Sequence, residues 1–228
     1  DLNHYSNNFI AETLIKTIAT TAVDENGEPR QGSFAEGIAL ARQFLEERVG
    51  FVPDSYVFGN GSGLNDVNRV SARQLIQLLA YMRRDFQTGN EFVNSLAVAG
   101  TQGTIGFRMK DTVAERRLRA KTGTLRGVSA LSGYVEGARG ETIAFSILVQ
   151  GYRSSVSPIW DVQNDIGLAL AGGSEILAPP SVETAAVVDD PGPATTEDKA
   201  QDPAAPSPAA TAQATVDFPE DGSKGGAP

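Results

Sequence analysis

Three consecutive stretches near the middle of the chain decide its fold: RLRAKTGTL (residues 117–125), GVSALSGYVEG (127–137) and ETIAFSILVQG (141–151). Each is short, rich in β-branched and other apolar residues, and separated from the next by a glycine-containing turn. This pattern is typical of β-strands. The turn GARG (137–140) predicts that the last two strands pair as an antiparallel hairpin.

Helical patterns lie on both sides of these strands. Apolar residues recur at helical spacing over residues 6–20, 33–49, 71–82 and 158–171. Ser33 with Glu36 forms a predicted capping box, and Ser71 is predicted to begin another helix. Three closely spaced glycines in VFGNGSGLNDVNRVS (57–71) predict a shaped loop. Helices beside an antiparallel sheet indicate an α/β fold class, in the sense of an α+β mixture.

Composition divides the chain into two parts. From residue 178 onward it carries nine of the twelve prolines and nine acidic residues against two lysines, which accounts for −7 of the net charge of −9. This segment has almost no large apolar residues apart from Phe218 and scattered valines, so it cannot bury enough surface to offset the conformational entropy lost on folding. Residues 178–228 are therefore predicted to be a disordered acidic tail. The folded domain is predicted to span residues 1–177.

The same counts exclude several kinds of partner. The first 177 residues hold 19 acidic and 17 basic side chains, and this near balance argues against a nucleic-acid-binding protein. No apolar run approaches the roughly 18–20 residues that cross a bilayer, so no transmembrane segment is predicted.

The residue inventory excludes several chemistries. The chain has no cysteine and one histidine, so thiol nucleophiles, zinc-thiolate sites and His-rich metal sites are excluded, and we expect neither a metal nor a cofactor. Ser62 does not fit the G-x-S-x-G nucleophile motif because Asn60 and Leu64 occupy its glycine positions. The surrounding loop also lacks the Lys-Ser/Thr of a phosphate-binding loop.

Two short motifs carry the candidate chemistry. KTGT (Lys121–Thr124) lies near the end of a predicted strand, where a lysine can hold an ammonium beside a pocket and a glycine allows another backbone to approach. Ser6 and Asn8 are separated by one residue, Asn7, near a predicted helix N-terminus. Each motif alone is explained by an ordinary strand end or helix cap, so only the combination is informative. Penicilloyl-serine transferases combine S-x-x-K, S-x-N and K-T-G motifs.

The chain resembles the D-alanyl-D-alanine carboxypeptidase/endopeptidases of the class C, low-molecular-mass penicillin-binding proteins, which are peptidase S13-like. The similarity covers most of residues 5–150 and includes YSNNFIAETL (5–14), GNGSGLNDVNRVSARQLIQLL (59–79), VAGTQGTIGFRM (98–109) and RAKTGTLRGVSALSGYV (119–135). Two residues depart from the family pattern: Asn60 stands where the family usually has Asp, and Asn65 where it usually has Ser. The resemblance implies a penicillin-binding/β-lactamase-like transpeptidase fold, an antiparallel sheet flanked by helices, of which this chain is the C-terminal portion.

The resemblance also implies roles for individual residues. The catalytic residues would be Ser6, Asn8 and Lys121, and the substrate-binding residues would be Thr122, Gly123 and Thr124. The expected reaction is acyl transfer through a serine ester, on peptidoglycan stem peptides ending in D-Ala-D-Ala, and β-lactams are expected to acylate the same serine. The substrate implies a periplasmic or other extracytoplasmic location.

The serine nucleophile of the family is missing from this pattern. No serine in the chain is followed three residues later by lysine, and the pair Thr13 and Lys16 has this spacing inside a predicted helix, where we expect it to be structural. We therefore expect an N-terminally truncated chain whose fold is incomplete and which is inactive alone. Two alternatives remain open: a non-catalytic cell-wall scaffold or partner-binding module with the same fold, and a β-lactamase.

Overall fold

A computed structural model describes residues 2–172 of the chain. The predicted tail at 178–228 lies outside the described residues, as does the end of the predicted domain after residue 172. In chain order the elements are α1 (Leu2–Tyr5), α2 (Asn8–Ala19), α3 (Phe34–Phe44), the π-helical turn η1 (Leu45–Val49), the 3-10 turn η2 (Leu64–Asp66), α4 (Ala72–Arg84), α5 (Gly89–Ser95), β1 (Ala97–Val98), the 3-10 turn η3 (Gly103–Ile105), β2 (Leu118–Leu125), β3 (Val128–Glu136), β4 (Thr142–Gln150) and α6 (Ser157–Gly172).

The four strands form one antiparallel sheet in the order β1-β2-β3-β4. The three predicted strands and the predicted hairpin are confirmed, with Glu136 opposite Thr142 at its closed end. The two-residue strand β1 was not predicted. It pairs with Arg119 and Ala120, and the neighbouring Ala99 donates to the Leu118 carbonyl, so within residues 2–172 β2 is paired on one side only from Lys121 onward.

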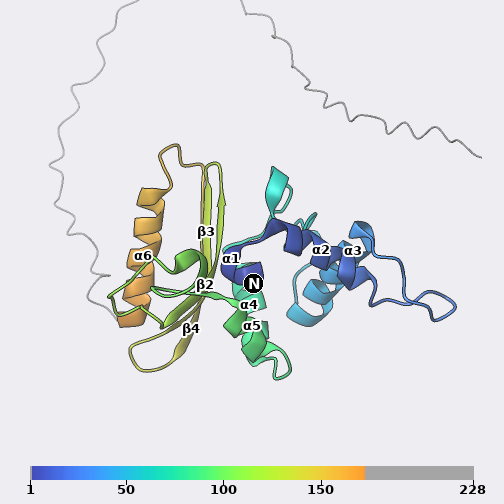
Figure 1. The fold of residues 1–228 in the computed structure, drawn as a ribbon, viewed down its shortest axis with the longest axis horizontal. Coiled ribbons are helices and arrows are strands. Elements are labelled where there is room, and N and C mark those ends of the chain that lie inside the picture. The colour runs from blue at the N-terminus through green and yellow to red at the C-terminus, as the bar shows by residue number, and fades with distance from the viewer. Residues whose placement is uncertain (1, 173–228) are drawn as a thin grey trace, which may run out of the picture. The chain divides into compact units, whose positions relative to one another are not determined.

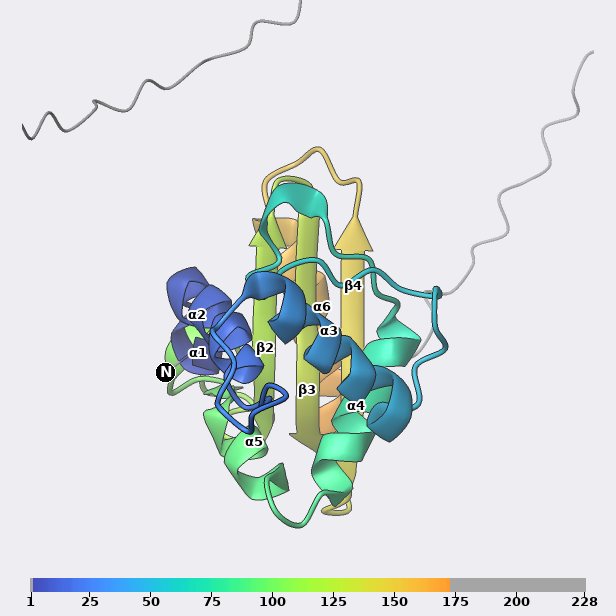
Figure 2. The same ribbon diagram turned by 90° about the vertical axis from the view of Figure 1, so that its right-hand side faces the viewer.

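Helices cover both faces of the sheet, as Figures 1 and 2 show. Alternate residues of a strand point to opposite faces, so each face has its own core. On one face α6 packs over a cluster that includes Leu118, Leu131 and Phe145. On the other, α4 and α5 pack around Tyr134, whose buried hydroxyl donates to the carbonyl of Leu79 at 2.7 Å. No helix within residues 2–172 combines the length and the apolar character needed to cross a membrane.

The predicted helix starts are formed in different ways. Ser71 and Gln74 make a complete capping box at the start of α4. At α3 the Ser33 hydroxyl accepts from the Glu36 N–H at 3.2 Å, but the Glu36 carboxylate binds the Ser33 hydroxyl and Arg30 instead of returning to the Ser33 backbone. The capping box predicted at Ser33 is therefore only half formed, because Arg30 competes for the carboxylate.

The first predicted helix is confirmed as α2, with Asn7 as its N-cap, and the short helix α1, which was not predicted, precedes it. The Ser6 N–H donates to the Leu2 carbonyl at 2.8 Å, which closes α1, and the Asn7 side chain caps α2 by accepting from Ile10. Ser6 lies between the two helices with φ of 56°, in the left-handed region. Ser6 therefore lies in a sharp turn just before α2, and this turn presents the Ser6 hydroxyl.

Candidate functional site

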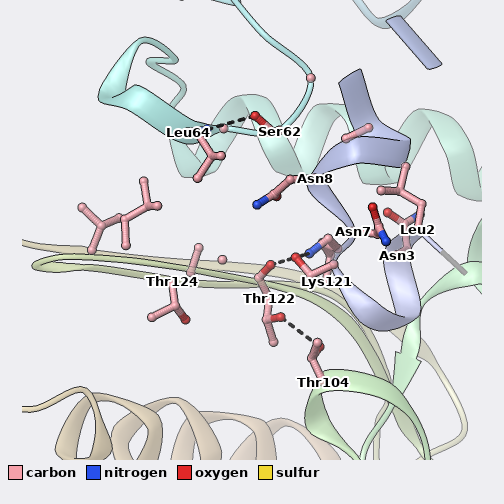
Figure 3. Close-up of a pocket in the computed structure, with 18 of the residues that line it drawn as sticks. Leu2, Asn3, Asn7, Asn8, Ser62, Leu64, Thr104, Lys121, Thr122 and Thr124 are labelled. Atoms are coloured by element: carbon pink, nitrogen blue, oxygen red, sulfur yellow. Dashed lines mark hydrogen bonds between the residues drawn. The ribbon is translucent and has the colours of Figure 1, made fainter. Parts of the chain in front are cut away.

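A cleft of about 720 Å³ lies where three segments meet (Figure 3). One side is the turn between α1 and α2, another is the glycine loop at residues 61–64, and the floor is the unpaired part of β2. A further wall comes from η3, from the segment that follows η3 and from α6. The residues that supply this wall are Thr104, Phe107, Arg108 and Trp160.

Ser6 and Lys121, which are 115 positions apart in the sequence, meet in this cleft. The Lys121 Nζ donates to the Ser6 hydroxyl at 2.8 Å and to the carbonyl of Thr122 at 2.6 Å. An ammonium has three N–H donors, so one remains available. Burial lowers the pKa of Lys121 because a charged amine is poorly solvated there. The two hydrogen bonds thus fix the position of the Lys121 ammonium, and its lowered pKa means that it gives up a proton more readily than an exposed lysine does.

The edge of β2 presents backbone groups to the cleft. The Leu118 carbonyl accepts from Ala99 on the β1 side, whereas the Arg117 carbonyl accepts from Glu136 on the β3 side. Backbone groups of successive strand residues alternate in direction, so the N–H and C=O of Thr122 and Thr124 point to the unpaired edge. The two N–H groups could donate to a carboxylate in the cleft, and a peptide backbone could bind both to them and to the Thr124 carbonyl.

Side chains on the two faces of β2 complete the floor of the cleft. The Thr122 hydroxyl donates to the Thr104 hydroxyl at 2.8 Å, which fixes its direction. A Cβ at Gly123 would lie 3.3 Å from the Ala130 Cβ, and both residues line the cleft. Glycine at this position therefore keeps the floor open for another chain.

Asn8 and the glycine loop form the opposite side. The Asn8 side chain points into the cleft between the loop that carries Ser62 and the strand that carries Lys121 (Figure 3). The Glu12 carboxylate, one turn further along α2, accepts the N–H of Ser62 at 2.9 Å and that of Gly61 at 3.4 Å. Hydrogen bonding from Ser62 lowers the pKa of Glu12 more than its slight burial raises it. This carboxylate ties the loop to the helix.

The two departures from the family pattern both have local explanations. The Asn60 amide donates to the Leu64 carbonyl at 2.8 Å while its oxygen accepts from the Gly63 N–H and from Asn68. An ionised aspartate could make only the accepting bonds. Asn65 has φ of 62°, a left-handed conformation that asparagine tolerates better than serine. The loop is therefore closed by amides rather than by a charge.

All six predicted site residues, from Ser6 to Thr124, line this one cleft, and their chemical roles stay predictions. The pair Thr13 and Lys16 is engaged elsewhere, since Thr13 donates to the carbonyl of Phe9 and the Lys16 Nζ lies 4.5 Å from the ring centroid of Phe34. Among residues 2–172, no group of three or more His, Cys, Asp or Glu side chains is arranged to hold a metal ion.

Sequence reasoning missed three contributors to the site: Glu12, Thr104 and Arg108. Glu12 had a usable signal, because position i+4 from Asn8 lies on the same face of a helix. Thr104 and Arg108 stood in the segment 98–109 but had no pattern of their own. They reach the cleft through the pairing of distant segments.

A Lys-Thr-Gly strand edge opposite a Ser-x-Asn turn, on an antiparallel sheet covered by helices, defines the penicillin-binding class of fold. The predicted fold is confirmed by a solved structure of penicillin binding protein 4 from Haemophilus influenzae, complexed with a β-lactam, which matches with a TM-score of 0.65 and 25% identity over 75% of this chain and 40% of that chain. The chain belongs to the D-Ala-D-Ala carboxypeptidase 3 (S13) family, whose model matches residues 1–167.

Curated relatives carry the same activity in their names. The D-alanyl-D-alanine carboxypeptidase of Actinomadura sp. (strain R39) is 37% identical over 172 residues, which are 73% of this chain and 30% of that protein. D-alanyl-D-alanine carboxypeptidase DacB of Haemophilus influenzae is 30% identical over 149 residues, 64% of this chain and 30% of that protein. The chain spans about a third of the length of these relatives.

Proposed function

We propose that the protein to which these residues belong is a serine-type D-Ala-D-Ala carboxypeptidase that also acts as an endopeptidase on peptidoglycan peptides, and that β-lactams acylate it. The observation that carries the proposal is the 2.8 Å hydrogen bond from the Lys121 Nζ to the Ser6 hydroxyl, made in a cleft beside an unpaired strand edge. Membership of the S13 family supports it. Because peptidoglycan lies outside the cytoplasm, the proposed place of action is periplasmic or otherwise extracytoplasmic.

In the proposed mechanism Ser6 and Lys121 return a proton to the leaving group. A serine hydroxyl attacks the carbonyl of the penultimate D-Ala and loses its proton to a base, which leaves a tetrahedral oxyanion. The C–N bond then breaks, and the departing nitrogen takes the Ser6 hydroxyl proton while the Lys121 ammonium supplies a new one. The proton that the base removed from the nucleophile then passes to Lys121, so that the base and Lys121 both regain their starting states. The product is an ester that water hydrolyses. The lowered pKa of Lys121 makes its ammonium a more ready donor.

The remaining residues hold the substrate. The Thr124 N–H, on the open edge of β2, would be one oxyanion donor, and a donor of this kind stabilises the transition state by about 2.7–4 kcal/mol. The hydroxyls of Thr122 and Thr124 would bind the terminal carboxylate or its β-lactam counterpart. Asn8 would hold a substrate amide, and the open floor at Gly123 lets the peptide lie along β2 as an added strand.

The nucleophile and its base are assigned to residues outside this sequence. None of the 228 residues forms a Ser-x-x-Lys motif, and Lys121 is already committed to Ser6 and Thr122. Covalent catalysis without a nucleophile leaves only binding elements. We therefore propose that the 228-residue chain alone does not turn over substrate.

Labelling with a fluorescent penicillin tests the proposal. The full-length protein that carries these residues is expected to form a covalent adduct and to release D-Ala from a pentapeptide, whereas the 228-residue chain stays unlabelled. An adduct on the 228-residue chain would place the nucleophile among these residues. If the full-length protein formed no adduct and released no D-Ala, the proposal would fail, and a scaffold role would account for the retained fold.

A further inference from the structure

The back wall of the cleft contains a buried cation, Arg108. Arg108 is only 4% exposed, yet it lines the cleft together with Phe107 and Trp160. Burial lowers the pKa of Arg108 to about 10, so the guanidinium remains charged at neutral pH. The proposed mechanism gives this charge no task.

The guanidinium is held firmly by neutral groups. Its Nε donates to the Asn164 side chain at 2.9 Å, and its Nη2 donates to the Gln163 side chain at 3.1 Å and to the Trp160 carbonyl at 3.3 Å. The Trp160 ring lies 5.6 Å from the guanidinium carbon. Among residues 2–172 no carboxylate lies within 4.0 Å of Arg108, and Asp161 is the acid whose charge acts on it from further away. The planar fork is fixed in orientation, and its charge is not neutralised by direct contact.

One nitrogen of the fork is free. Within the described part of the chain, Nη1 of Arg108 has no hydrogen-bond partner, although no wholly buried side-chain nitrogen or oxygen lacks one. Nη1 therefore keeps some access to solvent, and the cleft is the cavity that Arg108 lines.

The charged residues that line the cleft have one sign. Arg108 and Lys121 are both cations, and the described lining contains no Asp or Glu. The Glu12 carboxylate, which accepts from the N–H groups of Ser62 and Gly61, is not among the lining residues. A concave site with uncompensated positive charge attracts an anion. Lys121 is engaged with Ser6, whereas Arg108 has a free donor and a fixed charge.

We propose that Arg108 is the specificity-determining residue that makes this cleft select peptides with a free carboxylate on the residue that follows the scissile bond. The inference rests on the proposed function and deepens it. A carboxylate at the hydroxyls of Thr122 and Thr124 would lie on the same side of the sheet as Arg108. Both threonines share a strand face with Leu118, which contacts α6, and Arg108 is hydrogen-bonded to Gln163 and Asn164 of α6. A neutral carboxamide in the same place would gain nothing from the charge.

A pair of matched substrates tests this inference in the full-length protein. The first is a pentapeptide ending in D-Ala-D-Ala with a free acid, and the second is the same peptide with a terminal carboxamide. The wild-type protein is expected to prefer the acid. Arg108→Gln should lower kcat/KM for the acid by about tenfold or more, equivalent to about 1.4 kcal/mol, and for the amide by less than about threefold. Arg139→Gln makes the same charge change at an exposed turn and should alter neither value.

The two substrates separate recognition from structural support. An equal loss on acid and amide would show that Arg108 only supports the fold, and the inference would be wrong. Arg108→Lys keeps the charge and should keep the acid preference within about threefold. Loss of the preference in a folded Arg108→Lys protein would also overturn the inference. If the wild-type protein cleaved neither peptide, the proposed function would fail. Calorimetric binding of the two peptides to wild-type and Arg108→Gln proteins would then test the carboxylate preference directly.

Discussion

Substituting two glycines of the same loop by alanine tests how tightly the loop must approach α2. A Cβ at Gly61 would lie 2.7 Å from the Ala11 carbonyl oxygen and 2.7 Å from the Ile15 Cγ1. A Cβ at Gly59 would lie 3.5 Å from its nearest neighbour, a Val67 methyl group, which is ordinary contact. Neither glycine has a positive φ, so the backbone accepts alanine at both positions.

The distances set the expected size of the effect. In Gly61→Ala the loop must withdraw by roughly 0.7 Å to reach 3.4 Å, the start of ordinary contact, and overpacking of this kind costs about 1–3 kcal/mol. The Ser62 N–H then moves away from Glu12. Gly59→Ala should be neutral or stabilise by up to about 1 kcal/mol, because alanine restricts the unfolded chain.

Two measurements on the full-length protein check this. Urea denaturation should rank Gly61→Ala below wild type, with Gly59→Ala at or above it. The rate of acylation by a fluorescent penicillin should fall roughly tenfold or more in Gly61→Ala only, because a displacement near 1 Å in a catalytic cleft can cost up to about a hundredfold. If the two variants had the same stability and the same acylation rate, the close contact would have no consequence and the reasoning would be refuted.

Three further predictions concern single side chains. Lys121→Gln should slow acylation by about 10²–10⁴-fold, the range of general acid–base catalysis, with the urea midpoint little changed; a near-normal rate would remove this lysine from the mechanism. Asn60→Asp should cost about 0.5–1.5 kcal/mol in urea denaturation, because it removes the donor to the Leu64 carbonyl. Glu12 has a lowered folded pKa, so its contribution to stability is present above the unfolded value near 4.3 and is lost as pH falls through the folded pKa. Glu12→Gln should therefore flatten the acid limb of stability against pH, and an unchanged limb would contradict the assigned bonds.

The sequence predicted those parts of the fold that local patterns encode. The strands β2, β3 and β4 followed from β-branched runs between glycine turns, and Ser71 marked the start of α4 correctly. Strand β1 has only two residues and α5 only seven, so neither has a periodic signal long enough to detect. Helix α5 also lacks a capping side chain that could mark its start.

The candidate site was predictable only where a short motif carries the chemistry. Lys121 and Ser6 were found because their motifs are specific in combination. Arg108 was not found, because its importance depends on the hydrogen bonds that α6 makes with the segment after η3 and on the lack of a nearby carboxylate among the described residues. Such features arise from tertiary contacts and leave no spacing pattern in the chain.

The backbone at Ser6 restricts which alcohol can stand at that position. Threonine offers the same hydroxyl, but its branched Cβ crowds the backbone when φ is near +56°, and such residues are outliers in this region. A single methyl group would thus be tolerated by the reaction and rejected by the main chain. The choice between two chemically equivalent side chains is therefore made by conformation, before any substrate arrives.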